Sequence, residues 1–184
     1  MMKPRLTHSR RRASAGFTLI ELMVTIALIV IIMSFAAPSF STFQRNSELT
    51  STANTLLSSL TAARAEAMKR GQNVSVAPQD GSDWTKGWIV FVDTDASGTK
   101  NGTESVLMSE PAIPGTISMA TVPSGVVYLM FDGSGYPRLT GGAFQASSLD
   151  FTHTSGEARR IVSSPAGRLR VCKPDSSTCA ATVF

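Results

Sequence analysis

A long apolar run near the N-terminus constrains this chain more than any other feature. Residues 17–37 read FTLIELMVTIALIVIIMSFAA, interrupted by Glu21 and a few small hydroxyl residues. As a helix, this run is long enough to cross the roughly 30 Å hydrocarbon core of a bilayer. The three arginines at positions 10–12 are expected to stay in the cytoplasm and to direct the following domain across the membrane. The run therefore predicts a single transmembrane helix at residues 17–37.

The order of the segments argues against an ordinary secretory signal peptide. Residues 13–15 read Ala-Ser-Ala and have the small side chains of a signal-peptidase site, but they precede the apolar run instead of following it. The run is thus expected to remain on the mature protein. Five of the 17 Lys and Arg residues precede Gly16, so loss of residues 1–16 leaves 12 basic residues against 13 acidic ones. This balance excludes a globally basic DNA-binding protein, although it permits a local basic patch.

A second helical pattern follows the anchor. Residues 38–71 carry an apolar stripe at three- and four-residue steps, which predicts an amphipathic helix that continues the anchor and offers one face to a sheet. Lys69 and Arg70 followed by Gly71 are typical of a helix C-terminus. Pro38 is expected to kink this long helix without ending it. The stripe comprises Leu49, Ala53, Leu56, Leu57, Leu60, Ala63, Ala67 and Met68.

Short β-prone runs separated by Gly, Pro, Asp and Ser fill the remainder of the chain. They predict a β-rich globular domain at residues 72–184, and with the preceding helix they indicate an α+β fold. The predicted strands lie at residues 74–77, 88–92, 106–109, 116–122, 126–131, 144–151, 159–163 and 168–172.

The residues around the start of the apolar run, Gly-Phe-Thr-Leu-Ile-Glu at positions 16–21, resemble the prepilin signal of type IV pilins and pseudopilins. The resemblance implies that a prepilin peptidase removes residues 1–16 by cutting after Gly16 and methylates the new N-terminus at Phe17. It also implies that Glu21 contacts the N-terminus of a neighbouring subunit in a filament. A carboxylate in a membrane helix costs roughly 2.5–3.5 kcal/mol on insertion scales, which favours such a partner. The alternative is an incidental carboxylate that snorkels to the membrane interface.

Three later segments resemble the GspH/FimT branch of minor pilins: residues 46–71, residues 87–93, and residues 160–162 together with 167–170. The resemblance implies a pilin-like fold, a long N-terminal helix packed on a small antiparallel β-rich domain. It implies a protein of the bacterial inner membrane with a periplasmic domain, which later joins a filament with other pilins. Some relatives carry a cysteine near residues 75–78, and this chain does not.

A cluster of basic residues lies near the C-terminus and is the candidate ligand site. Gly167, Arg168 and Arg170 match the Gly-Arg-x-Arg motif that FimT-type proteins use as a DNA contact, which implies a role in DNA uptake during natural transformation. The cluster predicts salt-dependent binding of double-stranded DNA through phosphates, and since no aromatic residue interleaves with the arginines a stacking platform for single strands is disfavoured. The alternative is a solvated edge strand whose charges discourage aggregation. The full candidate set is Gly167, Arg168, Arg170, Lys173, Arg159 and Arg160.

Two cysteines are present, Cys172 and Cys179. In an oxidising periplasm a disulfide between them would close a small loop and hold Lys173 beside the arginines, and two free thiols are the alternative.

The acidic segment 93–104 has the spacing of a twelve-residue calcium loop, but the predicted flanking elements are strands. A polar hairpin connection explains the same residues, so no metal is expected. His153 is the one histidine outside residues 1–16, and it lies without a nucleophile motif or ligand spacing, so it is expected to be a surface or strand residue. The sequence predicts no enzyme activity and no cofactor.

The sequence leaves three functions open. The favoured one is a FimT-like minor pilin near the pilus tip that binds DNA. The alternatives are a GspH-like pseudopilin of a type II secretion system and a minor pilin that primes pilus assembly without binding DNA.

Overall fold

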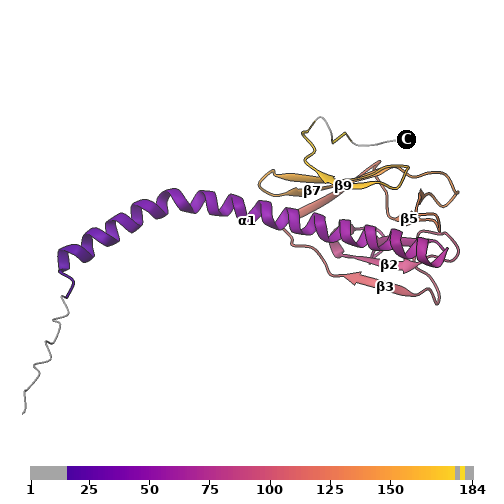
Figure 1. The fold of residues 1–184 in the computed structure, drawn as a ribbon, viewed down its shortest axis with the longest axis horizontal. Coiled ribbons are helices and arrows are strands. Elements are labelled where there is room, and N and C mark those ends of the chain that lie inside the picture. Colours follow the sequence, from indigo (N-terminus) through magenta and orange to yellow (C-terminus); the bar gives the residue numbers. More distant parts are fainter. Residues whose placement is uncertain (1–15, 177–178, 181–184) are drawn as a thin grey trace, which may run out of the picture. The chain divides into compact units, whose positions relative to one another are not determined.

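The structure is a computed structural model that describes residues 16–176, 179 and 180, without the side chains of residues 35–38. The chain divides into two units, one ending at Thr42 and one beginning at Phe43. Helix α1 (Leu19–Arg70) runs through both units, and every strand belongs to the second. Figure 1 shows the order of these elements along the chain.

Helix α1 behaves as two segments of different chemistry. In the first unit the large apolar side chains from Phe17 to Met33 are exposed. Within the described residues no single helix is long and apolar enough to cross a membrane, and Leu19–Ser34 and Ser39–Arg70 meet that requirement together as a bent pair. The helix continues through Pro38, as expected.

The helix ends where its sequence predicts. Gly71 adopts φ +63°, and its N–H donates to the Ala67 carbonyl at 2.9 Å, while the N–H of Gln72 donates to the same carbonyl at 3.3 Å. A left-handed residue after the last turn is the usual way to satisfy the final carbonyls, and glycine adopts it at little cost.

Within residues 16–176, nine strands form two antiparallel sheets, with strand orders β3-β2-β1-β5-β6 and β4-β7-β8-β9. In Figure 1 the second half of α1 runs between the labelled strands β7 and β9 above it and β2 and β3 below it. The first sheet contains β1 (Val74–Pro78), β2 (Trp88–Val92), β3 (Val106–Glu110), β5 (Leu129–Phe131) and β6 (Pro137–Arg138); the second contains β4 (Ile117–Val122), β7 (Ser147–His153), β8 (Ala158–Ser163) and β9 (Leu169–Cys172).

Eight of these strands fall on the predicted runs, and the α+β prediction is confirmed. Two strands begin later than predicted: β5 begins at Leu129 and not at residue 126, and β7 begins at Ser147 and not at residue 144. Strand β6 was not predicted, since two residues beginning with proline give no alternating pattern.

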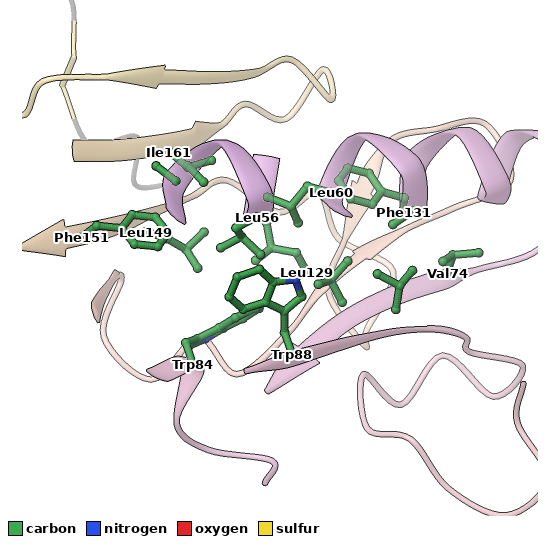
Figure 2. Packing of buried hydrophobic residues seen from close by; sticks show 14 of the residues in the cluster. Leu56, Leu60, Val74, Trp84, Trp88, Leu129, Phe131, Leu149, Phe151 and Ile161 are labelled. Carbon is green, nitrogen blue, oxygen red and sulfur yellow. The ribbon is translucent and has the colours of Figure 1, made fainter. Parts of the chain in front are cut away.

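The core forms where the apolar stripe of α1 meets both sheets. Leu56 and Leu60 point from the helix toward Trp88, Leu129 and Leu149 (Figure 2), and all five side chains are buried. Burying each large apolar side chain contributes about 1.5–3 kcal/mol. The helix members of the core are Leu49, Ala53, Leu56, Leu60, Ala63 and Ala67.

The predicted stripe needs two corrections. Met68 is 48% exposed, so it lies at the margin of the core and not within it. Ser59 is fully buried, although the apolar pattern did not include it. Its hydroxyl accepts a 3.0 Å hydrogen bond from the indole N–H of Trp88. A buried hydroxyl is tolerated when it is paired in this way.

Candidate functional site

The first candidate site is the start of α1. Glu21 Oε2 accepts hydrogen bonds from the backbone N–H of Thr18 at 2.8 Å and from its hydroxyl at 3.0 Å, and the N–H of Glu21 donates to Thr18 Oγ1 at 3.2 Å. This reciprocal pattern is a capping box, which satisfies two of the unpaired N–H groups at a helix N-terminus.

The capping box gives Glu21 a local role in the chain that the sequence analysis missed. The signal was available, because Thr18 and Glu21 have the Ser/Thr-x-x-Glu spacing at the start of an apolar run. Gly16 and Phe17 are exposed, and no heavy atom lies within 4 Å of a Cβ placed on Gly16. The predicted leader lies largely outside the described residues, so cleavage after Gly16, methylation of Phe17 and the intersubunit contact of Glu21 stay predictions.

The second candidate site is the β8–β9 hairpin. Its turn is closed by hydrogen bonds from Gly167 N–H to the Ser164 carbonyl at 2.8 Å and from Ser164 N–H to the Arg168 carbonyl at 3.0 Å. Gly167 has φ +75°, and a Cβ there would lie 2.6 Å from the carbonyl oxygen of Gly135. The glycine of the predicted motif therefore meets another turn of the same chain.

Arg64 of α1 fixes the position of this hairpin. Its Nε donates to the Gly135 carbonyl at 2.9 Å, and its NH1 donates to the Gly167 carbonyl at 2.8 Å. One guanidinium thus joins the β5–β6 turn to the β8–β9 turn, a role that the sequence did not reveal because the three residues are far apart along the chain.

Three basic side chains follow that turn. Arg168 and Lys173 are exposed and Arg170 is partly exposed. Within the described part of the chain, the side chains of Arg168, Arg170 and Lys173 make no ion pair and no hydrogen bond; Arg168 and Lys173 are hydrogen-bonded to serine hydroxyls through their backbone atoms. Among the described strands, β9 lies at the edge of its sheet. We call Arg168, Arg170 and Lys173 the basic strand end.

The other two predicted DNA contacts have partners within the protein. Arg160 makes a two-point ion pair with Asp150, with Nε–Oδ1 at 2.5 Å and NH2–Oδ2 at 2.6 Å, and its NH1 donates to the Cys179 carbonyl at 3.1 Å. The hydrogen bond to Asp150 raises the pKa of Arg160 above its usual value. Arg159 donates to the Asn46 side chain of α1 at 3.2 Å. Asp150 thus neutralises Arg160, whereas Arg159 keeps its charge but is tied to α1 through a neutral amide.

The structure contains the disulfide between Cys172 and Cys179, with Cα atoms 5.8 Å apart. Cys172 is the last residue of β9, and its register partner on β8 is Arg160. Because Arg160 also binds the Cys179 carbonyl, both ends of the small loop are attached to β8. Lys173 lies in this loop, directly after the strand.

The acidic segment 93–104 connects β2 to β3, which form an antiparallel hairpin. Oxygens of Asp93, Asp95 and Glu104 lie within 4.8 Å of one another. Each carboxylate, however, already accepts hydrogen bonds inside the loop, and that of Asp93 is buried with donors from Ser75, Ser97 and Gly98. The hydrogen bond from the Asn101 side chain holds the pKa of Asp95 below its usual value. The loop is thus a hairpin connection whose carboxylates order its own backbone.

His153, the last residue of β7, is buried and not on the surface. Its Nδ1 lies 2.6 Å from the hydroxyl of Ser155, and its Nε2 lies 4.0 Å from Glu48 Oε2 of α1. The histidine connects the β7–β8 turn to the helix. This contact could not be predicted from local patterns because Glu48 is distant along the chain.

The comparisons with known proteins agree with this architecture. Residues 52–178 match the family described as type II transport protein GspH, and residues 11–37 match the prokaryotic N-terminal methylation motif. No curated protein matches the chain.

Two solved proteins are similar in fold. The type IV minor pilin FimU of Pseudomonas aeruginosa strain PAO1, in one crystal form, has a TM-score of 0.59 and 22% identity, covering 76% of this chain and 96% of its own. In a second crystal form of FimU the TM-score is 0.56 and the identity 21%, covering 73% of this chain and 97% of its own. The minor pseudopilin EpsH of the Vibrio cholerae type 2 secretion system has a TM-score of 0.51 and 16% identity, covering 70% of this chain and 99% of its own.

An N-terminal helix that carries a methylation motif and continues into a small antiparallel β domain defines a type IV pilin-like protein. Within that class, the chain belongs to the family described as type II transport protein GspH, whose model matches residues 52–178. Pilins and pseudopilins are structural proteins.

Proposed function

We propose that this chain is a minor subunit of a type IV pilus that binds DNA for uptake in natural transformation. In this proposal a prepilin peptidase removes residues 1–16, residues 17–37 anchor the protein in the inner membrane and then enter the filament core, and residues 38–71 continue the helix. The β-rich domain at residues 72–184 then lies in the periplasm. The match of residues 11–37 to the methylation motif supports the processing step.

The observation that carries the DNA proposal is the basic strand end. Arg168, Arg170 and Lys173 lie next to one another along the chain without a partner among the described residues, whereas the nearby Arg160 is neutralised by Asp150. Unpaired guanidinium and ammonium groups on an open edge bind phosphate oxygens, and both duplex and single-stranded DNA offer those oxygens.

The number of free charges sets the expected salt dependence. Three phosphate contacts give a slope of log K against log salt of about −2.7 for a duplex, at about 0.9 per contact. Affinity should therefore fall roughly 40-fold between 50 and 200 mM salt.

The test is a binding titration of full-length protein in detergent micelles against a fluorescently labelled DNA duplex. The double variant Arg168→Gln with Arg170→Gln should bind more weakly at low salt and lose only roughly 3-fold to 4-fold over the same salt range. Lys86→Gln with Lys100→Gln is the matched control, because it removes the same charge from two exposed lysines elsewhere on the domain. Absence of binding by the wild type at low salt, or equal weakening in the control, would refute the proposal.

A pseudopilin of a type II secretion system is the second candidate, since residues 52–178 match the family described as a type II transport protein. That function requires no DNA affinity. In that case Arg168 and Arg170 protect the edge strand β9 from aggregation. Neither the substitutions at these arginines nor those at Lys86 and Lys100 would then affect any nucleic-acid interaction.

A further inference from the structure

An aromatic pair is exposed beside the basic strand end. Tyr136 precedes β6 and is 41% exposed, and Phe144, which bridges to Arg138 of β6, is 53% exposed. Their rings make an edge-to-face contact with centroids 5.8 Å apart and planes at 83°. We call Tyr136 and Phe144 the aromatic pair.

Arg138 holds the pair in position. Its guanidinium carbon lies 4.0 Å from the centre of the Phe144 ring, and its Nε makes a 2.7 Å ion pair with Asp132. Burial raises the pKa of Asp132, but the guanidinium of Arg138 and the N–H groups of Tyr136 and Ser134 outweigh it and hold that pKa below the usual value. The guanidinium of the Arg138–Asp132 ion pair thus covers one face of Phe144, and Phe144 is still 53% exposed.

The turn that leads into Tyr136 touches the turn that leads into Arg168. A Cβ on Gly167 would lie 2.6 Å from the Gly135 carbonyl oxygen, and Arg64 binds both glycine carbonyls. Tyr136 and Arg168 each follow one of these glycines directly, so each Cα lies about 3.8 Å further along its chain. The sequence did not predict that Tyr136 lies near Arg168, because the two residues belong to different hairpins.

The two features together match one kind of ligand. Unpaired cations bind phosphates, and exposed rings bind the flat face of a nucleobase. A duplex presents phosphates but keeps its base faces inside the stack, whereas a single strand presents both.

We infer that the preferred ligand of this surface is a single-stranded nucleic acid, with its phosphates at the basic strand end and its bases on the aromatic pair. This inference rests on the proposed function, because it concerns the same site and specifies the form of nucleic acid. Stacking is tolerant of base identity, so the surface binds single strands without sequence preference.

The probes are a labelled 20-nucleotide oligothymidine and a labelled 20-base-pair duplex, titrated against full-length protein in detergent micelles at 50 mM salt. Wild type should bind the oligothymidine more tightly than the duplex. The variant Tyr136→Leu with Phe144→Leu keeps apolar volume but removes both rings, and it should bind oligothymidine about 5-fold to 150-fold more weakly for each base that stacks. Duplex binding by this variant should match that of wild type.

Leu139→Ala is the control, because Leu139 is also 41% exposed in the same hairpin but offers no ring. The fluorescence of Trp84 and Trp88, both buried, reports whether each variant is folded. Equal wild-type affinity for the two probes, or unchanged oligothymidine binding in the double variant, overturns the inference and leaves DNA binding intact. If the Tyr136→Leu with Phe144→Leu variant changes self-association and leaves nucleic-acid binding unchanged, the inference fails and the aromatic pair is a protein contact. If neither probe binds, the proposed function fails as well.

Discussion

Replacing Gly167 by alanine tests whether this glycine serves the fold or a ligand. Gly167 has φ +75°, and an added Cβ would lie 2.6 Å from the Gly135 carbonyl oxygen and 3.1 Å from Arg64 Cζ. Both neighbours are held in place by the hydrogen bonds of Arg64. The substitution must therefore strain the backbone and displace the guanidinium that joins the two turns.

The expected cost combines two effects. A non-glycine residue in the left-handed region costs about 1–2 kcal/mol. Losing one hydrogen bond from a charged donor costs about 1.5–3 kcal/mol, and partial relaxation of the turns reduces the total. We expect a loss of about 2–4 kcal/mol in the free energy of unfolding of the β-rich domain.

Urea titration followed by tryptophan fluorescence measures this loss, because Trp84 and Trp88 are 3% and 1% exposed and become solvated on unfolding. With a urea slope of about 2 kcal/mol per molar, the midpoint should fall by about 1–2 M. Gly141→Ala is the matched control, since no heavy atom lies within 4 Å of its Cβ position and its φ is not in the left-handed region. A Gly167→Ala midpoint equal to that of the control would show that the contact between the turns does not stabilise the domain.

Three further predictions concern the remaining sites. Asp150→Asn removes the ion-pair partner of Arg160, whose side chain is 15% exposed, and should cost about 1–3 kcal/mol in the urea titration, between the values for exposed and buried pairs; an unchanged midpoint would contradict the pairing. Cys172→Ser with Cys179→Ser, or reduction of the wild type, should lower stability by about 2–3 kcal/mol because the disulfide closes a short loop, and a midpoint insensitive to reductant would speak against this contribution. Glu21→Gln keeps a side chain that can complete the capping box with Thr18 but removes the charge, so it should insert into membranes normally and fail to enter filaments; normal incorporation would show that Glu21 acts only as a helix cap.

Local patterns in the sequence predicted the elements of the fold well. The runs of β1 and β2 are short, rich in β-branched and aromatic residues and buried almost throughout, and the stripe from Leu49 to Ala67 is periodic over enough residues to identify the helix face. Strand β6 carries no such signal because it has two residues, and its position depends on pairing with β5.

Contacts between distant residues could not be predicted in the same way. The pairing of Arg160 with Asp150 depends on the register of the β7–β8 hairpin, and the contact of Arg64 with two turns depends on how both sheets pack on α1. For this reason the sequence treated five basic residues as one cluster, whereas among the described residues the structure pairs Arg160 with Asp150 and gives Arg159 a hydrogen bond to Asn46.

The most direct test of the account is the intact mass of the protein purified from the membranes of its own cells. The account predicts a mature chain that begins at Phe17 and carries one added methyl group, with residues 17–37 retained. A chain that still begins at Met1, or one cut after the apolar run, would contradict assembly through a processed N-terminus.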